Sequence, residues 1–245
     1  MQLGASERVW VTGDVHLAPQ DEARSAFFLR FFAAAREQAD RLVILGDLFD
    51  YWVGPRFARG CAYRPVVEAF EAASAAGFPV DFIAGNRDFL GPGELRALGL
   101  RVHGDALVLE REGQRTVVTH GDLLVAGDRS YKRYRRVVRA AWFRFGYWLV
   151  PEWFRLWVAH RLRGASERKL VSVEPYAFPL DLELSQAWLA GFEAQDLLCG
   201  HLHREEEHEH SPERATRMLP GWAPTEGSHF KLTPGARPRL CAFKD

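Results

Sequence analysis

Five short apolar runs along the chain each lead into a small residue followed by a polar side chain. With their polar ends, they are RVWVTGDVH (8–16), RLVILGDLFD (41–50), VDFIAGNRD (80–88), TVVTHGD (116–122) and DLLCGHLH (196–203). Continuous runs of Val, Ile and Leu of this length are typical of strands that are buried on both faces. The pattern therefore predicts five interior strands of a layered sheet.

Between several of these runs, apolar residues recur at helical spacing. The segments 23–39 and 64–77 show this pattern, and the second ends on Gly77, a residue favoured just after the last helical turn. Strands that alternate with helices predict an α/β fold. Because ligands bind beyond the carboxyl ends of strands in such sheets, we expect the five polar clusters to meet in one crevice.

Composition narrows the class of protein. A chain of 245 residues with 47% hydrophobic residues can form one domain, residues 1–245, with a sizeable core. Lys and Arg total 32, as do Asp and Glu, so no global field would gather nucleic acid, and we expect no nucleic-acid partner.

Localisation is predicted to be cytoplasmic. The three cysteines lack CxxC spacing, which fits a reducing compartment, and the first residues show no signal-peptide pattern. The most apolar long stretch, residues 140–159, is interrupted by Arg144, Pro151, Glu152 and Arg155, so we expect no membrane-spanning helix.

The polar residues at the strand ends are candidate metal ligands. They offer carboxylate, amide and imidazole groups but no thiolate, a set that suits Mn, Fe, Zn or Mg in a hydrolytic site. A pair of ions about 3.5–4 Å apart would use seven ligands and act on both oxygens of a phosphoryl displacement. The candidates are Asp14, His16, Asp47, Asn86, His120, His201 and His203.

In order along the chain, the blocks DxH, GD, GN, HGD and GHLH resemble the calcineurin-like metallophosphoesterases. The resemblance implies a β-sandwich flanked by helices and two divalent ions, with manganese expected first and Fe, Zn or Mg as alternatives. It implies one ion on Asp14, His16 and His203 and a second on Asn86, His120 and His201. Asp47 would bridge them.

Other residues near these blocks receive separate interpretations. His208 and His210 match nothing in the family pattern, and their stretch REEEHEH is interpreted as a solvated, charged loop. His103, in a similar HGD stretch, is interpreted as structural. Close behind the ligands, three carboxylates are candidates to orient them: Asp50, Asp88 and Asp122.

Arg87 departs from the wider family, most members of which have His after the Asn. A guanidinium stays charged and cannot act as a general acid, but it can bind phosphate oxygens in a forked geometry. We therefore predict catalytic roles for Asn86, Arg87 and His120, and a leaving group that departs without a proton. A phosphate released from a pyrophosphate is such a group, because its second pKa is about 6.

A narrower resemblance covers nearly the whole chain. The stretches LGDLFDYWVG, GNRDFL, HGDLL, DRSYKRYRR, GHLHR and TEGS are similar to those of UDP-2,3-diacylglucosamine diphosphatases of lipid A synthesis. In that family water attacks a phosphorus of the UDP group, releasing UMP and 2,3-diacylglucosamine 1-phosphate. The resemblance implies substrate contacts from Asn86, Arg87, Asp128, Tyr131, Arg163, Ser166 and His201. A segment after Ser166 that is shorter than the family's leaves the exact sugar and acyl chains open.

Residues from about 127 to 170 are predicted to form an inserted helical lid that is broken at Pro151. The basic stretch 128–139 could face phosphates, and the aromatic stretch 142–157 could cover acyl chains or rest on the inner face of the cell membrane as part of a peripheral, monomeric protein. Aromatic residues at helical spacing are equally typical of ordinary core. That alternative would favour an enzyme for another nucleotide pyrophosphate or a soluble phosphodiester instead of a nucleotide-activated glycolipid. A non-catalytic binding protein is a third hypothesis, although every expected ligand is present.

Overall fold

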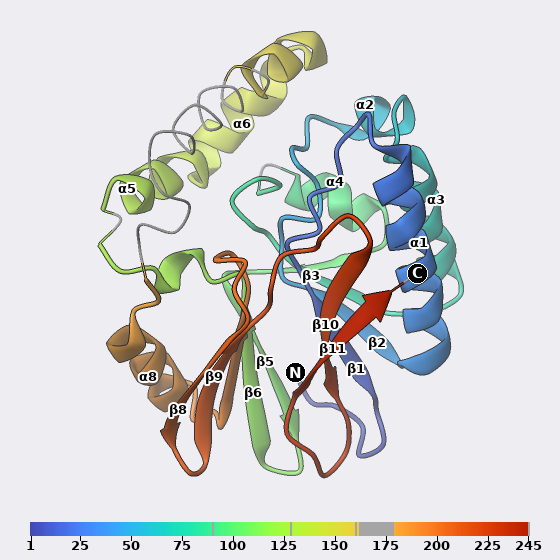
Figure 1. Cartoon of the computed structure of the whole chain (residues 1–245). Helices are drawn as coiled ribbons and strands as arrows, with labels where there is room; N and C mark the ends of the chain where they lie inside the picture. Colours follow the sequence, from blue (N-terminus) through green and yellow to red (C-terminus); the bar gives the residue numbers. More distant parts are fainter. Residues whose placement is uncertain (90, 128, 160, 162–178, 245) are drawn as a thin grey trace.

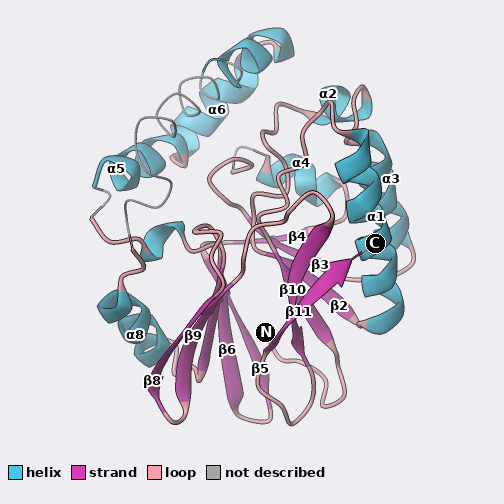
Figure 2. Cartoon of the chain, viewed as in Figure 1, coloured by secondary structure: helices cyan, strands magenta, loops and turns pink. Residues whose placement is uncertain are grey.

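Two β-sheets form the centre of the computed structural model, which describes residues 1–89, 91–127, 129–159, 161 and 179–244 (Figures 1 and 2). The first sheet contains, in spatial order, β11 (Arg239–Lys244), β10 (Glu226–Leu232), β1 (Val9–Thr12), β2 (Arg41–Ile44), β3 (Val80–Ile83) and β4 (Arg101–His103). The second contains β5 (Ala106–Arg111), β6 (Gln114–Thr119), β7 (Asp196–Cys199), β9 (Arg214–Met218) and β8 (Glu206–Ser211).

Helices cover the outer faces of both sheets (Figure 1). The first sheet carries α1 (Glu22–Gln38), α2 (Pro55–Arg59), α3 (Arg64–Ala75) and α4 (Pro92–Ala97), and the second carries α8 (Leu182–Gly191). A 3-10 turn, η1 (Asp122–Leu124), leads to α5 (Arg129–Val138) and α6 (Ala141–Leu149). The α/β fold and the β-sandwich flanked by helices are confirmed.

Four of the five predicted strands are buried throughout because both of their faces are covered, whereas the fifth, β6, is buried only over Val117–Thr119. All positions of β1, β2, β3 and β7 are buried, as their apolar runs predicted. One apolar cluster lies between the two sheets and includes Val11, Val43 and Leu198. A second cluster lies between the first sheet and its helices, and a third lies between the second sheet and α8.

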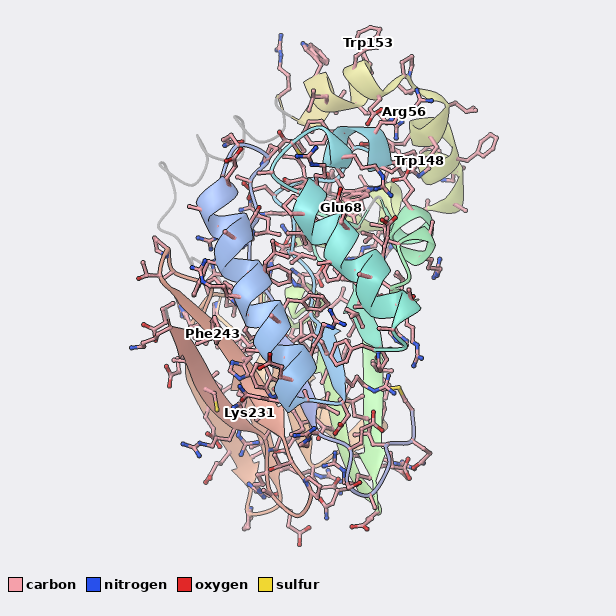
Figure 3. All side chains as sticks on the ribbon, turned by 90° about the vertical axis from the view of Figure 1, so that its right-hand side faces the viewer. Arg56, Glu68, Trp148, Trp153, Lys231 and Phe243 are labelled. Carbon is pink, nitrogen blue, oxygen red and sulfur yellow. The ribbon has the colours of Figure 1, made fainter. Side chains whose placement is uncertain are left out.

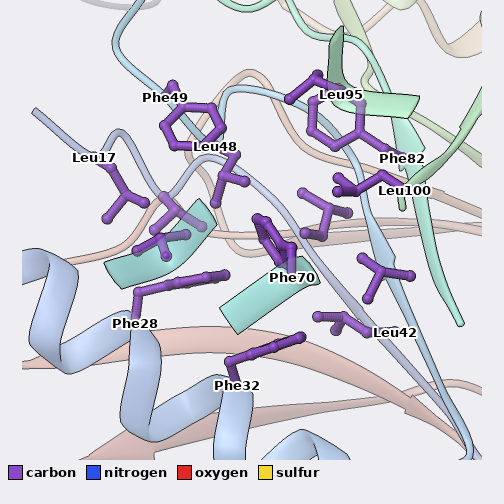
Figure 4. Close-up of a cluster of buried hydrophobic side chains, with 14 of the residues drawn as sticks. Leu17, Phe28, Phe32, Leu42, Leu48, Phe49, Phe70, Phe82, Leu95 and Leu100 are labelled. Carbon is purple, nitrogen blue, oxygen red and sulfur yellow. The ribbon is translucent and has the colours of Figure 1, made fainter. Parts of the chain in front are cut away.

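The predicted helices over 23–39 and 64–77 correspond to α1 and α3. Asp21 caps α1 by accepting a hydrogen bond from the backbone N–H of Arg24 at 2.9 Å. Phe28 and Phe32 of α1 pack against Phe70 of α3, with ring centroids 6.1 and 5.1 Å apart (Figure 4). This aromatic contact holds the two helices side by side on the first sheet.

Both sheets contain a parallel centre. β1 to β4 are mutually parallel, and β6, β7 and β9 are parallel in the other sheet. The carboxyl ends of these strands therefore reach the same edge of the sandwich, where α5 and α6 extend beyond the sheets (Figure 1). This edge carries the candidate site.

The interpretation of REEEHEH as a loop was wrong, because residues 206–211 form the edge strand β8. Its burial alternates residue by residue, and it pairs antiparallel with β9. On the inner-facing positions His208 contacts Glu206 at 3.2 Å and His210 contacts Thr216 at 2.9 Å. A charged edge strand is stable here because its neighbour satisfies the backbone and only one side faces solvent.

The inserted helices have one face on the protein and one in solvent. The break at Pro151 is confirmed, since α6 ends at Leu149 and the chain is helical again at 152–159. Phe143 and Trp148 pack against the core, whereas Trp142, Phe145, Leu149 and Trp153 are 69–71% exposed. Trp153 projects from the end of the insertion (Figure 3). In the described part of the chain, no helix is long and apolar enough to cross a membrane.

Candidate metal centre

All seven predicted metal ligands converge at the carboxyl edge of the sheets. The ligands form two groups, and within each group all the ligand atoms lie within 4.8 Å of one another. One group is Asp14, His16 and His203, and the other is Asp14, Asp47 and His120. Asn86 and His201 join the second group through contacts with His120. Five separate strand ends thus supply one cluster, as the sequence predicted.

The first half of the cluster contains Asp14, His16 and His203. The Nε2 atoms of His16 and His203 lie 3.0 Å apart, and His203 Nε2 is 3.7 Å from Asp14 Oδ1. Asp14 is fully buried, yet its Oδ1 has no hydrogen-bond partner among the described residues. A buried carboxylate oxygen that faces two imidazole nitrogens and lacks a donor is well placed for a divalent cation.

The second half contains Asn86, His120 and His201. Asn86 Oδ1 lies 3.0 Å from His120 Nε2 and 3.0 Å from His201 Nδ1, and the two ring nitrogens are 3.2 Å apart. The Nδ1–H of His120 donates to the carbonyl of Leu45 at 2.7 Å. This bond fixes the tautomer that leaves the Nε2 lone pair directed at the cluster.

Asp47 belongs to the second group of ligand atoms, with Oδ1 3.8 Å from His120 Nε2. The carboxylate of Asp14 belongs to both groups. The bridging role expected of Asp47 remains a prediction.

Protonation equilibria in the cluster fit metal binding. Burial raises the pKa of Asp47 to about 7, in spite of the nearby His120 and Arg87, so a cation beside it would offset a large desolvation cost. Burial lowers the pKa of His16 to about 2 and that of His201 to about 4. Both imidazoles are therefore neutral at physiological pH, the form that binds metals.

The backbone at the cluster is unusual. Five of the ligands have positive φ angles between 49° and 71°, a region that non-glycine residues rarely adopt: Asp14, His16, Asp47, His201 and His203. Such conformations cost on the order of 1–3 kcal/mol each and gather at functional sites. The strand ends are thus bent to aim side chains inward.

Two glycines next to the ligands are required by close approach of these side chains. A Cβ on Gly85 would collide with Asp47 Oδ1, and a Cβ on Gly200 would collide with Asp14 Oδ2. The absent side chains leave room for the carboxylates of Asp47 and Asp14.

Arg87 lies beside the cluster. Its backbone N–H donates to Asp47 Oδ1 at 2.9 Å, and its guanidinium lies 3.6 Å from Asp47 Oδ2 and 3.2 Å from Asp50 Oδ1. The side chain is 32% exposed, so it can also reach a ligand in the crevice.

The three candidate supporting carboxylates contact different groups. Asp88 accepts hydrogen bonds from the N–H groups of Leu48 and Gly85, each at 2.9 Å, so it holds the loops of Asp47 and Asn86. Asp50 contacts Arg87. Asp122 accepts hydrogen bonds from Tyr131 and Arg135 instead of contacting a ligand directly.

Some supporting residues carried no sequence signal. Arg24 of α1 donates to the carbonyl of Val15 at 2.6 Å and to that of Trp222 at 2.8 Å, so it fixes the turn that carries Asp14 and His16. In the sequence, nothing distinguishes Arg24 from an ordinary exposed arginine of a helix. His103 contacts Asp81 rather than the cluster.

Of the predicted substrate contacts outside the cluster, Tyr131 lies with its ring centroid 6.2 Å from that of His201. Asp128, Arg163 and Ser166 lie outside the described residues. Their roles remain predictions.

Comparison with known proteins agrees with this arrangement. A profile of the calcineurin-like phosphoesterases matches residues 7–205. The chain belongs to the calcineurin-like phosphoesterase family.

Its relatives within this calcineurin-like family share most of their length with it. It is 34% identical to the UDP-2,3-diacylglucosamine hydrolase of Escherichia coli O139:H28, over 90% of this chain and 92% of that protein. Identity to the enzyme of the same name from Aeromonas hydrophila subsp. hydrophila is 34%, over 80% and 81%. A solved archaeal phosphodiesterase superposes with a TM-score of 0.50 at 11% identity, covering 96% of this chain and 99% of the other, which supports the fold alone.

Proposed function

We propose that this calcineurin-like phosphoesterase hydrolyses the pyrophosphate of UDP-2,3-diacylglucosamine to UMP and 2,3-diacylglucosamine 1-phosphate. The observation that carries the proposal is Arg87, which lies beside Asp47 and Asp50 at the position where a general acid would otherwise be expected. Relatives that bear the name of this hydrolase match 90% of the chain, which supports the substrate.

The cofactor is proposed to be a pair of manganese ions held by the seven clustered side chains. When bound, such ions supply Lewis acidity toward phosphate oxygens and an activated water. The orphaned Oδ1 of Asp14 and the neutral imidazoles of His16 and His201 support this donor set.

Arg87 and Asn86 are proposed to hold the reacting phosphate. Both follow Gly85 at the end of β3, and the backbone N–H of Arg87 is fixed by Asp47. The guanidinium can donate two parallel hydrogen bonds to phosphate oxygens and stabilise the charge that builds on them. His120 is held in one tautomer by Leu45, so its Nε2 lone pair stays directed at the metal cluster, where it would help to hold the ion beside the reacting phosphate.

The bond changes need no protonated side chain at the leaving group. The water oxygen forms a bond to one phosphorus and releases a proton to solvent, while the bridging P–O bond breaks and its electron pair stays on the departing phosphate. A phosphate with a second pKa of about 6 accommodates this charge at neutral pH. Arg87, which remains protonated, fits this reaction better than it fits release of an alkoxide.

The exposed aromatic residues support a peripheral location at the inner face of the cell membrane. Trp142, Phe145, Leu149 and Trp153 are apolar side chains that the described residues leave largely exposed. Aromatic side chains with basic residues nearby are typical of helices that lie in a membrane interface. A lipid substrate would be reached directly from such a position.

The deciding experiment measures UMP release from detergent-solubilised UDP-2,3-diacylglucosamine, with UDP-N-acetylglucosamine as the soluble comparison. With Mn²⁺ present, we expect turnover of the lipid substrate and at most one hundredth of that rate with the soluble sugar. Chelation should abolish turnover and Mn²⁺ should restore it. Absence of UMP release from protein that demonstrably binds Mn²⁺ would refute the proposed substrate. Equal turnover of both compounds would instead favour a soluble pyrophosphate.

A further inference from the structure

A network of charged side chains connects helix α5 to the strand ends that carry Asn86 and His120. None of its members belongs to the cluster of seven ligands. The members are Asp105, Asp122, Tyr131, Arg135 and Arg139.

On the side of His120, the network is built on Asp122, which is 2% exposed and follows His120 by two residues. The hydroxyl of Tyr131 and the Nε–H of Arg135 both donate to Asp122 Oδ2, each at 2.6 Å. The Tyr131 ring meanwhile lies against His201. These contacts place the first half of α5 over the second half of the metal cluster.

On the side of Asn86, the contact is made by Arg139. Its Nη2 donates to the backbone carbonyls of Ala84 at 2.8 Å and Gly85 at 3.0 Å, the two residues directly before Asn86. Ala84 and Gly85 are buried, and Arg139 supplies a hydrogen-bond donor to both of their carbonyls at the end of β3. Arg139 therefore joins the end of α5 to the turn that carries Asn86 and Arg87.

Asp105, in the loop between β4 and β5, joins the two sides. Its carboxylate accepts hydrogen bonds from Arg135 at 2.7 and 3.3 Å and from Arg139 at 2.7 Å. Its own carbonyl accepts from the hydroxyl of Thr119, the residue before His120. The two arginine side chains are 11% and 19% exposed, and the half-exposed carboxylate of Asp105 is the one acidic group that contacts both of them among the described residues.

We propose that Asp105 and Arg139 are positioning residues that fix α5 over the Asn86, His120 and His201 side of the cluster, and thereby fix the substrate-facing side chains of α5 relative to Arg87. The inference rests on the proposed function, since it concerns binding of that substrate. Displacement of a positioning element by about 1 Å can cost as much as 100-fold in rate. The HGD stretch at 103–105 resembles a ligand block, but its aspartate, Asp105, would position α5 instead of binding a metal.

The test uses three variants: Arg139→Gln, Asp105→Asn and the double variant that combines them. Arg136→Gln is the control. Arg136 is an exposed arginine of the same helix that forms no hydrogen bond or ion pair within the described residues. Its replacement by Gln removes the same charge as Arg139→Gln but breaks no such contact. For both single variants we expect kcat/KM for UDP-2,3-diacylglucosamine to fall about 30-fold, mostly through KM. The double variant should lose less than the product of the two single losses, because Asp105 and Arg139 share one contact.

Two further measurements separate positioning from general damage. Mn²⁺ affinity, from calorimetric titration, should stay within about twofold of wild type, because no ligand is changed. Amide hydrogen exchange in residues 129–138 should rise about tenfold in Arg139→Gln but not in Arg136→Gln. Unchanged exchange or unchanged KM overturns the inference, as does an equal effect in Arg136→Gln. Failure of wild type to release UMP would refute the proposed function alone, and the exchange experiment would still decide whether α5 is held by these residues.

Discussion

Individual residues at this site are held in conformations that only their surroundings make tolerable. Five of the proposed ligands have positive φ angles, and two glycines leave space for the carboxylates of Asp14 and Asp47. Metal coordination would offset this strain, because each bent backbone directs a donor to the same small volume. The ligand residues could be predicted from the sequence, but their strained backbone conformations could not.

Replacement of Arg87 tests the leaving-group argument. We expect Arg87→His to lower kcat/KM for the lipid substrate about 100-fold, because a neutral imidazole supplies neither the positive charge nor the two parallel hydrogen bonds of a guanidinium to the phosphate. Arg87→Lys should retain more activity, with a loss of about tenfold, since it keeps the charge but not the geometry. The measurement is steady-state UMP release, with the exposed Arg56→His as a control for the substitution itself. Arg87→His with wild-type activity would mean that no guanidinium is needed.

Among the structural elements, the strands were predicted better than the insertion. Apolar runs identified β1, β2, β3 and β7 because burial on both faces demands such runs. β8 was missed because an edge strand with one solvent-facing side can be almost wholly charged. The pairing of Asp105 with Arg139 joins residues 34 positions apart in sequence, and no local pattern encodes such a contact.

The exposed face of α6 should control membrane binding. Trp142 and Phe145 are each 69% exposed, whereas Phe143 of the same helix packs on the core. Replacing the two exposed rings by serine should weaken binding to liposomes that contain anionic lipid by at least about tenfold, because each buried ring contributes on the order of 1 kcal/mol or more. Folding should be unaffected.

Phe192→Ser provides the control for the liposome experiment. Phe192 is also exposed, at 37%, but follows α8 on the outer face of the second sheet. Sedimentation with liposomes should show wild-type binding for this variant. If Trp142→Ser/Phe145→Ser binds as tightly as wild type, the apolar face has another use, and the proposed membrane location loses its main support.

At the scale of the whole molecule, the layer between the first sheet and its helices contains a buried titratable group. His229 of β10 is 2% exposed and lies against Trp10 and Phe31, with ring centroids 4.1 and 5.4 Å away. Neither of its ring nitrogens has a hydrogen-bond partner among the described residues. Burial, together with the charge of Lys231, lowers its pKa to about 3.

This histidine should make stability fall with acidification. Above its unfolded pKa of about 6.5 the ring is neutral in both states, so the layer keeps its full stability. As the pH falls below that value, only the unfolded chain takes up the proton, and stability is lost until the folded pKa near 3 is passed. Between pH 7 and 5, wild type should lose on the order of 2 kcal/mol more than His229→Phe, which cannot titrate. Urea unfolding at several pH values would measure this difference. Parallel curves for wild type and His229→Phe would show that the buried ring accepts a proton in the folded state.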